Sequence, residues 1–177
     1  MLKRYYSQVM FIILIFFIAS CAAVTSDIKV DAEADPKANI KGYKTYVWLG
    51  SAEILYDPAG RWEPPGFDAD SEVKWLIDRE LRKRGMMEVN TNPDMIIGFI
   101  AGIDMAALEL TENPEKTITI IQNVPKGALA LVFVDASTGY PIWIGQAVGD
   151  IQQEPNTETV RKRLDYAVSE MFKLLPR

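Results

Sequence analysis

Apolar residues recur at helical spacing in two segments of the chain. The first segment begins at a polar cap, Asp70 or Ser71, and stops at Gly85, and the second begins at Asn156 or Thr157. Their apolar stripes consist of Val73, Leu76, Ile77 and Leu81 in the first segment and of Val160, Leu164, Ala167, Val168, Met171, Phe172 and Leu175 in the second. This pattern predicts two amphipathic helices, each with one face to bury.

Other segments have the pattern of β-strands. Residues 43–49 alternate with a period of two and are rich in aromatic and β-branched side chains. Residues 128–134 and 142–148 flank a turn that contains Gly139, which predicts a hairpin. Residues 95–103 are apolar with only two glycines between, and this predicts a strand that is buried on both faces.

The least regular pattern lies between residues 104 and 126. Residues 117–121 alternate as an edge strand does, and the acidic, proline-containing stretch before them is expected to be a loop. Two amphipathic helices each need a sheet face to pack against. The order of elements therefore predicts a single α+β domain, in which a mainly antiparallel sheet packs with two amphipathic helices.

The first 26 residues have the pattern of a targeting segment. Lys3 and Arg4 precede ten consecutive apolar residues, 9–18, and no acidic residue precedes Asp27. Residues 18–21, with the sequence IASC, then resemble the lipobox of bacterial lipoproteins, in which an aliphatic residue and two small residues precede a lipid-modified cysteine. The segment is therefore interpreted as a lipoprotein signal peptide.

The lipobox divides the chain into a signal peptide at 1–20, an acylated N-terminus and tether at 21–41, and one domain at 42–177. The resemblance implies that Cys21, the only cysteine, becomes the N-terminus and carries acyl chains that hold the protein at a membrane. No Asp follows Cys21, which in similar lipoproteins of diderm bacteria favours an outer-membrane anchor facing the periplasm.

Two alternatives accompany this interpretation of the N-terminal part. A retained transmembrane segment would have only the 16 residues of 9–24, whereas a spanning helix needs about 20 apolar residues. The polar stretch 25–41 has few large hydrophobic residues, so it is either a tether or a first edge strand.

The composition excludes several kinds of chemistry and partner. No histidine occurs, so the chain has no imidazole base and no histidine zinc ligand, and a single cysteine allows no intrachain disulfide. The formal net charge is −5, and it becomes −7 when residues 1–20, with two basic and no acidic side chains, are removed. Nucleic acid is therefore an unfavourable partner. Neither a cofactor nor a metal is expected, because no phosphate-binding or metal-binding motif occurs.

The most unusual stretch of the domain is residues 56–67, which contains three aromatic residues and three prolines. A stiff loop that carries aromatic rings can offer a stacking surface to a sugar or a peptide. Trp62, Glu63 and Phe67 are therefore candidate ligand contacts. The alternative is that Trp62 and Phe67 fold back and cap the core.

Several single residues are expected to have structural roles. Asp94 and Asp135 stand at turns, where a carboxylate accepts backbone N–H groups. Trp143 is expected in the core. Gly145 and Gly149 alternate with it along one strand, which indicates a bulge or close packing against an aromatic ring rather than a phosphate-binding loop.

These segments together resemble the bacterial lipoprotein family known as domain of unknown function 4136. The resemblance covers roughly residues 27–177 and includes the lipobox; it rests on Tyr43-Lys44-Thr45-Tyr46-Val47-Trp48, Gly85, Pro93-Asp94, Gly127, Leu131-Val132-Phe133-Val134-Asp135-Ala136-Ser137-Thr138-Gly139, Trp143-Ile144-Gly145 and Leu175-Pro176. Ile144 and Met86 depart from it, since a basic residue and an aromatic residue are common there. The resemblance implies a lipid-anchored envelope protein of α+β fold with no established activity and no catalytic residue.

Two classes of function follow. The first is a noncatalytic binding or structural module whose partners are the membrane, through the lipid on Cys21, and an envelope protein or cell-wall glycan. The second is a hydrolase of envelope glycans that uses carboxylates among Glu63, Asp68 and Asp70. Their adjacency in a loop does not set the separation of roughly 5 to 9 Å that such chemistry needs, so we favour the first class and expect no enzyme activity.

Overall fold

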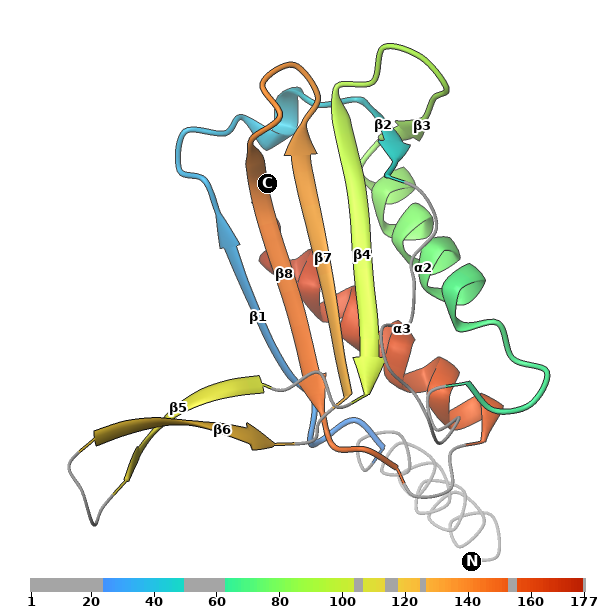
Figure 1. The fold of residues 1–177 in the computed structure, drawn as a ribbon. Helices are drawn as coiled ribbons and strands as arrows, with labels where there is room; N and C mark the ends of the chain where they lie inside the picture. The colour runs from blue at the N-terminus through green and yellow to red at the C-terminus, as the bar shows by residue number, and fades with distance from the viewer. Residues whose placement is uncertain are drawn as a thin grey trace, which may run out of the picture.

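The computed structural model describes residues 24–49, 63–103, 107–113, 118–124, 127–152 and 156–176. A sheet and two helices make up most of it (Figure 1). The elements are β1 (Lys29–Ala34), the short 3₁₀ helix η1 (Ile40–Gly42), β2 (Thr45–Trp48), α2 (Ala69–Lys83), β3 (Met87–Glu88), β4 (Met95–Ile103), β5 (Ala107–Asn113), β6 (Ile118–Val124), β7 (Gly127–Asp135), β8 (Pro141–Gly149) and α3 (Thr157–Leu174).

Six of the strands form one sheet, in the order β1-β8-β7-β4-β2-β3. The pairs β1–β8, β8–β7 and β7–β4 are antiparallel, and β2 runs parallel to both β4 and β3. Both helices lie against the same face of this sheet (Figure 1). The predicted α+β fold, with a mainly antiparallel sheet and two amphipathic helices, is confirmed.

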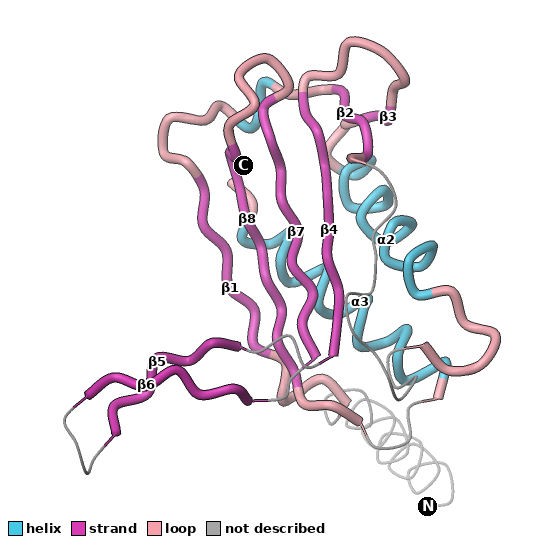
Figure 2. Tube along the Cα trace, viewed as in Figure 1, coloured by secondary structure: helices cyan, strands magenta, loops and turns pink. Residues whose placement is uncertain are grey.

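The remaining two strands, β5 and β6, pair with each other as a separate antiparallel hairpin (Figure 2). The prediction of a loop before residues 117–121 is therefore wrong for residues 107–113. These residues pair in register with residues 118–124, from Ala107↔Val124 to Asn113↔Ile118. Pairing satisfies the backbone groups that face the other strand, and this favours a strand over a loop.

The two helices begin where side chains accept their first N–H groups. For α3 the cap is Asn156, as predicted, and its side chain accepts the N–H of Thr159. For α2 the cap is Asp68, whose side chain accepts the N–H of Ser71, so this helix begins earlier than the predicted cap at Asp70 or Ser71. The predicted apolar stripes of both helices are buried.

The sheet is buried on one face only. On β4, the side chains that face the helices (Met95, Ile97, Phe99 and Ala101) are buried, but Ile100 on the other face is 42% exposed. The expectation that this strand is buried on both faces is therefore wrong. Both helices pack on one side, and no described element covers the apolar residues on the other.

The polar segment before β2 contains an edge strand. β1 pairs with β8 along its whole length, from Lys29↔Val148 to Ala34↔Trp143. The sheet therefore already includes residues 29–34, which lie within the segment 21–41 that the sequence analysis assigned to the tether. Of the two alternatives for the polar stretch 25–41, a tether or a first edge strand, the edge strand is correct for residues 29–34.

The centre of the core is the indole ring of Trp143, which is 1% exposed. Its ring lies 4.8 Å from that of Phe133 on β7 and 6.3 Å from that of Phe172 on α3, measured between centroids. It also lies across the backbone of Gly145, because a Cβ at that glycine would stand 2.3 Å from the ring atom Cη2. The expected close packing of Gly145 against an aromatic ring is confirmed.

This contact predicts that Gly145→Ala destabilises the protein. No room exists for a methyl group beneath a fully buried ring, so the variant should lose about 1 to 3 kcal/mol of unfolding free energy. Gly98→Ala is the matched control in the same sheet, because its new methyl group would meet only the exposed side chain of Leu49, at 3.4 Å. It should change the free energy by less than about 0.5 kcal/mol. Urea unfolding measures both, and equal losses would contradict the packing described.

Candidate functional site

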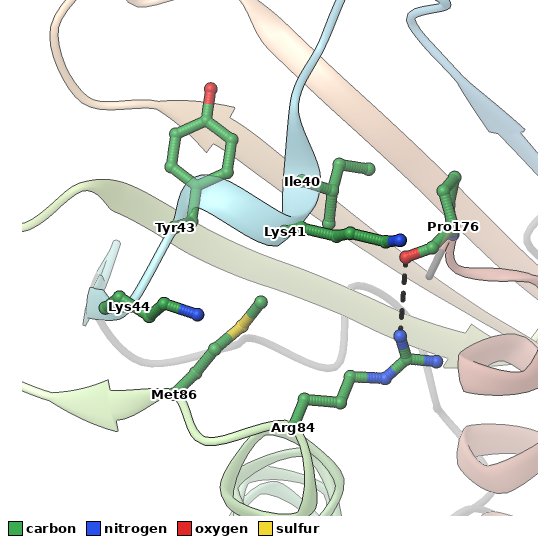
Figure 3. A pocket seen from close by; sticks show the side chains of 7 residues that line it. All are labelled: Ile40, Lys41, Tyr43, Lys44, Arg84, Met86 and Pro176. Carbon is green, nitrogen blue, oxygen red and sulfur yellow. Dashed lines mark hydrogen bonds between the residues drawn. The ribbon is translucent and has the colours of Figure 1, made fainter.

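A pocket of about 530 Å³ opens at the end of the sheet where η1 and β2 lie, opposite the end where the described chain begins (Figures 1 and 3). Three segments that are distant in sequence meet there. Its lining comprises Ile40, Lys41, Tyr43, Lys44, Arg84, Met86 and Pro176. The volume falls within the range of about 300 to 1,000 Å³ that is typical of small-molecule sites.

One part of the pocket is apolar and rigid. Ile40 and Met86 belong to the hydrophobic core, and each exposes less than 5% of its surface. Tyr43 is fixed because its hydroxyl donates a hydrogen bond to Asp135 at 2.6 Å. Burial raises the pKa of Tyr43 to about 12, and the hydrogen bond to Asp135 acts in the same direction. The hydroxyl therefore stays protonated at neutral pH, and it keeps the ring in place.

The other part of the pocket is cationic. Lys41 and Lys44 are exposed, and neither forms an ion pair within the described part of the chain. Arg84 is bound to the C-terminal end of α3, because its guanidinium donates to the carbonyls of Phe172, Leu175 and Pro176. It thus adds hydrogen bonds at the end of a helix, where intrahelical donors run out, although the carbonyl of Phe172 also accepts the N–H of Leu175.

The carboxylates near the pocket accept hydrogen bonds from the protein itself. Asp94 accepts the N–H groups of Lys44 and Thr45, and this lowers its pKa. Asp135 accepts the hydroxyl and N–H of Ser137 as well as the Tyr43 hydroxyl, and these bonds hold its pKa well below the usual range. The predicted turn role is confirmed for Asp135, which accepts N–H groups of its own turn. For Asp94 it is not, because the N–H groups that it accepts belong to residues 44 and 45, far away in the sequence.

A second polar cluster, which we call the Arg163 clamp, lies at the opposite end of the sheet. It consists of Arg163 on α3, the carboxylate of Asp27, the carbonyl of Val24 and the backbone of Asp150. Arg163 donates to both oxygens of Asp27, at 2.7 and 2.6 Å, and to the carbonyls of Val24 and Asp150. Asp27 in turn accepts the N–H of Asp150 at 2.7 Å.

The clamp has room only because residue 149 is a glycine, and it lowers the pKa of Asp27. A Cβ at Gly149 would stand 2.6 Å from the guanidinium of Arg163. The close packing expected at Gly149 therefore exists, against a guanidinium and not against an aromatic ring. Hydrogen bonding to Arg163 is the main reason that the pKa of Asp27 falls to about 2.

The structure describes two of the four site residues predicted from the sequence. Cys21 and Trp62 lie outside the described residues. Glu63 is exposed, and its carboxylate accepts the N–H of Ala69 at the start of α2. Phe67 is 8% exposed, and the guanidinium of Arg161 lies 5.6 Å from the centre of its ring.

Phe67 also borders a second pocket, of about 300 Å³, between the first turns of α2 and α3. The half-exposed Trp75 and the side chain of Arg161 line the same pocket. Phe67 is thus one of the buried core residues, as the alternative of folding back onto the core predicts for it. It also borders this concave surface, at a different end of the fold from the cationic pocket.

The sequence pattern does not predict the cationic pocket. Lys41, Lys44 and Arg84 are ordinary polar residues in the sequence, and they meet only because the C-terminal ends of α2 and α3 lie beside η1. Met86 was noted only as a departure from a family pattern. No local motif marks such a site.

Among the described residues, no three His, Cys, Asp or Glu side chains are grouped so that they could hold a metal ion. No helix in the described ranges has both the length and the hydropathy that crossing a bilayer requires.

Comparison with known families and structures gave matches to the fold. A family model described as a domain of unknown function (DUF4136) matches residues 30–177. A DUF4136 family protein from Bacteroides thetaiotaomicron VPI-5482 aligns with a TM-score of 0.58 and 12% identity, over 84% of this chain and 95% of that chain. A PDZ domain protein from Parabacteroides distasonis ATCC 8503 aligns with a TM-score of 0.52 and 12% identity, over 90% of this chain and 39% of that chain.

A minor lipoprotein from Acinetobacter baumannii aligns with a TM-score of 0.36 and 13% identity, over 76% of this chain and 93% of that chain. That score is too low for any inference about this chain. Because the two better structural matches are only 12% identical to this chain, they show a similar fold and nothing more. No curated protein matches the sequence.

The Arg163 clamp predicts a specific dependence of stability on pH. The pKa of Asp27 is lower in the folded protein than its ordinary value of 3.8, so the charged carboxylate stabilises the fold above about pH 4. This contribution begins to fall below about pH 4 and is lost as the pH falls through about 2. Asp27→Asn should therefore be less stable than the unmodified protein at pH 6, and the difference should shrink steadily as the pH falls to about 2 and below.

Thermal unfolding of both proteins across this range measures the difference. Glu158→Gln is the control, because Glu158 pairs with Lys162 on the exposed surface of α3 and should contribute little. If the unmodified protein and Asp27→Asn were equally stable at pH 6, the clamp would have no energetic role.

Proposed function

The chain belongs to the family described as domain of unknown function DUF4136, and with the lipobox-like sequence before Cys21 we propose that it is a lipid-anchored module of the bacterial cell envelope. The module is noncatalytic and binds or supports another envelope component. Family membership confirms the resemblance drawn from the sequence over residues 30–177, which do not include the lipobox. The anchor, the cellular location and the partner are parts of the proposal.

The observation that carries the proposal is the position of the Arg163 clamp. The clamp holds the carbonyl of Val24, and only two residues separate Val24 from Cys21. An extended chain of this length spans at most about 11 Å. A lipid on Cys21 would therefore keep the clamped end of the domain close to the membrane surface.

This geometry gives the domain an orientation. The clamp contains Arg163, near the start of α3, and the cationic pocket contains Pro176, just beyond its end. The helix between Arg163 and Leu174 extends about 17 Å, at 1.5 Å per residue. In an outer-membrane lipoprotein that faces the periplasm, the cationic pocket would point away from the membrane, toward envelope proteins and the cell wall.

We also propose that Trp62, Glu63 and Phe67 contact the envelope component that the module binds. Glu63 and Phe67 lie at the start of α2, beside the first turns of α3. This is the half of the domain that carries the clamp. A component bound there would lie near the membrane surface, separate from the cationic pocket.

The pKa of Asp68 and the hydrogen bond that Glu63 accepts favour a noncatalytic module over a glycan hydrolase. A general acid in such an enzyme needs a raised pKa. The N–H of Ser71 instead lowers the pKa of Asp68, because Asp68 caps α2. Glu63 also accepts an N–H at the start of this helix. Both carboxylates therefore act in the local structure of α2.

The anchor is tested by the substitution Cys21→Ser. The variant should not incorporate radioactive palmitate and should stay as the uncleaved precursor, because the acceptor thiol is missing. Ser20→Ala is the control, since alanine is common at this position of a lipobox, and it should be labelled normally. Labelling of Cys21→Ser at the level of the unmodified protein would contradict the lipid anchor.

The noncatalytic assignment is tested with the purified full chain in a non-ionic detergent. We expect no hydrolysis of peptidoglycan, measured by the release of soluble fragments. Sustained hydrolysis that Glu63→Gln or Asp68→Asn abolishes would favour the hydrolase instead.

A further inference from the structure

We propose that the cationic pocket binds an organic ligand that carries two or more acidic groups, either carboxylates or phosphates. The pocket belongs to the folded domain and does not depend on the lipid anchor. The proposal therefore goes beyond the envelope role, and each can fail without the other.

The charge of the pocket is the first argument. The chain as a whole has a net charge of −5, yet the seven lining residues include three cations and no carboxylate. Asp94, the carboxylate whose pKa responds to the charge of Lys44, already accepts two backbone N–H groups and the Thr45 hydroxyl. The carboxylates of Asp135, Asp94 and Asp35 act on Tyr43 and help to raise its pKa, but none of them lines the pocket. The charged side chains that an anion would contact in the pocket are therefore cations.

The arrangement of the cations is the second argument. In Figure 3, Met86 lies between Lys44 on one side and Arg84 with Lys41 on the other. A single small anion would contact one side. A ligand with two acidic groups could contact both, and its body would lie against the half-buried Tyr43 and the exposed Pro176, since Ile40 and Met86 are almost fully buried.

The third argument is that much of the pocket is already fixed. Arg84 is held by carbonyls of α3, and Tyr43 is held by Asp135. The backbone that carries the lysines is also fixed, because Tyr43 donates its N–H to Ile40 and Lys44 donates its N–H to Asp94. Binding would then need to order only the two lysine side chains, which keeps its entropic cost low.

Lysine ammonium groups suit this ligand class. Each carries three N–H donors on a flexible stem, and it binds phosphate or carboxylate as a point charge without a fixed geometry. The same pocket could therefore accept either acidic group, and an experiment with one probe of each kind distinguishes them.

The test uses the full chain in a non-ionic detergent, at constant ionic strength, with lysine side-chain signals followed by NMR. The two probes are inorganic pyrophosphate and propane-1,2,3-tricarboxylate. At least one of them should cause saturable shifts of the Lys41 and Lys44 signals. Lys41→Gln and Lys44→Gln should each weaken binding by about tenfold, the effect of one charge-assisted hydrogen bond.

Lys29→Gln is the matched control, because Lys29 is also exposed but lies on β1, away from the pocket. It should leave the affinity within about twofold of the original, the change expected when only the net charge falls by one. Saturation by pyrophosphate alone would assign a phosphate ligand, and saturation by the tricarboxylate alone would assign a carboxylate ligand. The absence of saturation with both probes, or an equal loss in Lys29→Gln, would overturn the proposal.

Discussion

The Trp143 ring, which packs across the backbone of Gly145, lies at the centre of the contact between the sheet and α3. The ring is fully buried, and it packs against Phe133 on β7 and Phe172 on α3. Only glycine leaves space beneath it, because any Cβ at position 145 would collide with the ring. The indole N–H has no hydrogen-bond partner among the described residues. Its burial therefore carries a cost, and the ring packing must outweigh that cost.

Once α3 is docked in this way, its two ends organise the two polar clusters of the molecule. Near its start, Arg163 binds Asp27 and the carbonyl of Val24, which attaches the N-terminal segment to the end of the sheet. Beyond its last turn, Arg84 binds the carbonyls of Leu175 and Pro176, which completes the cationic pocket. One packed helix thus separates the end nearest Cys21 from the end that presents the pocket.

Elements with a strong local pattern could be predicted from the sequence, whereas features set by distant residues could not. The last helix and the hairpin of β7 and β8 were predicted closely because their periodicity and turn residues are local. The one-sided burial of β4 depends on both helices packing against the same face, which the pattern of a single strand does not contain. The cationic pocket is a similar case, because Lys41, Lys44 and Arg84 become neighbours only through the packing of three separate segments.

The central claim is that the clamped end of the domain lies at the membrane while the pocket faces away from it. Paramagnetic broadening by spin-labelled lipid headgroups, measured on the lipidated protein in phospholipid nanodiscs, tests this claim directly. The amide signals of Asp27 and Asp150 should broaden strongly, and those of Lys41 and Lys44 should stay sharp, because α3 separates the two ends by about 17 Å or more. Equal broadening at both ends would contradict the account.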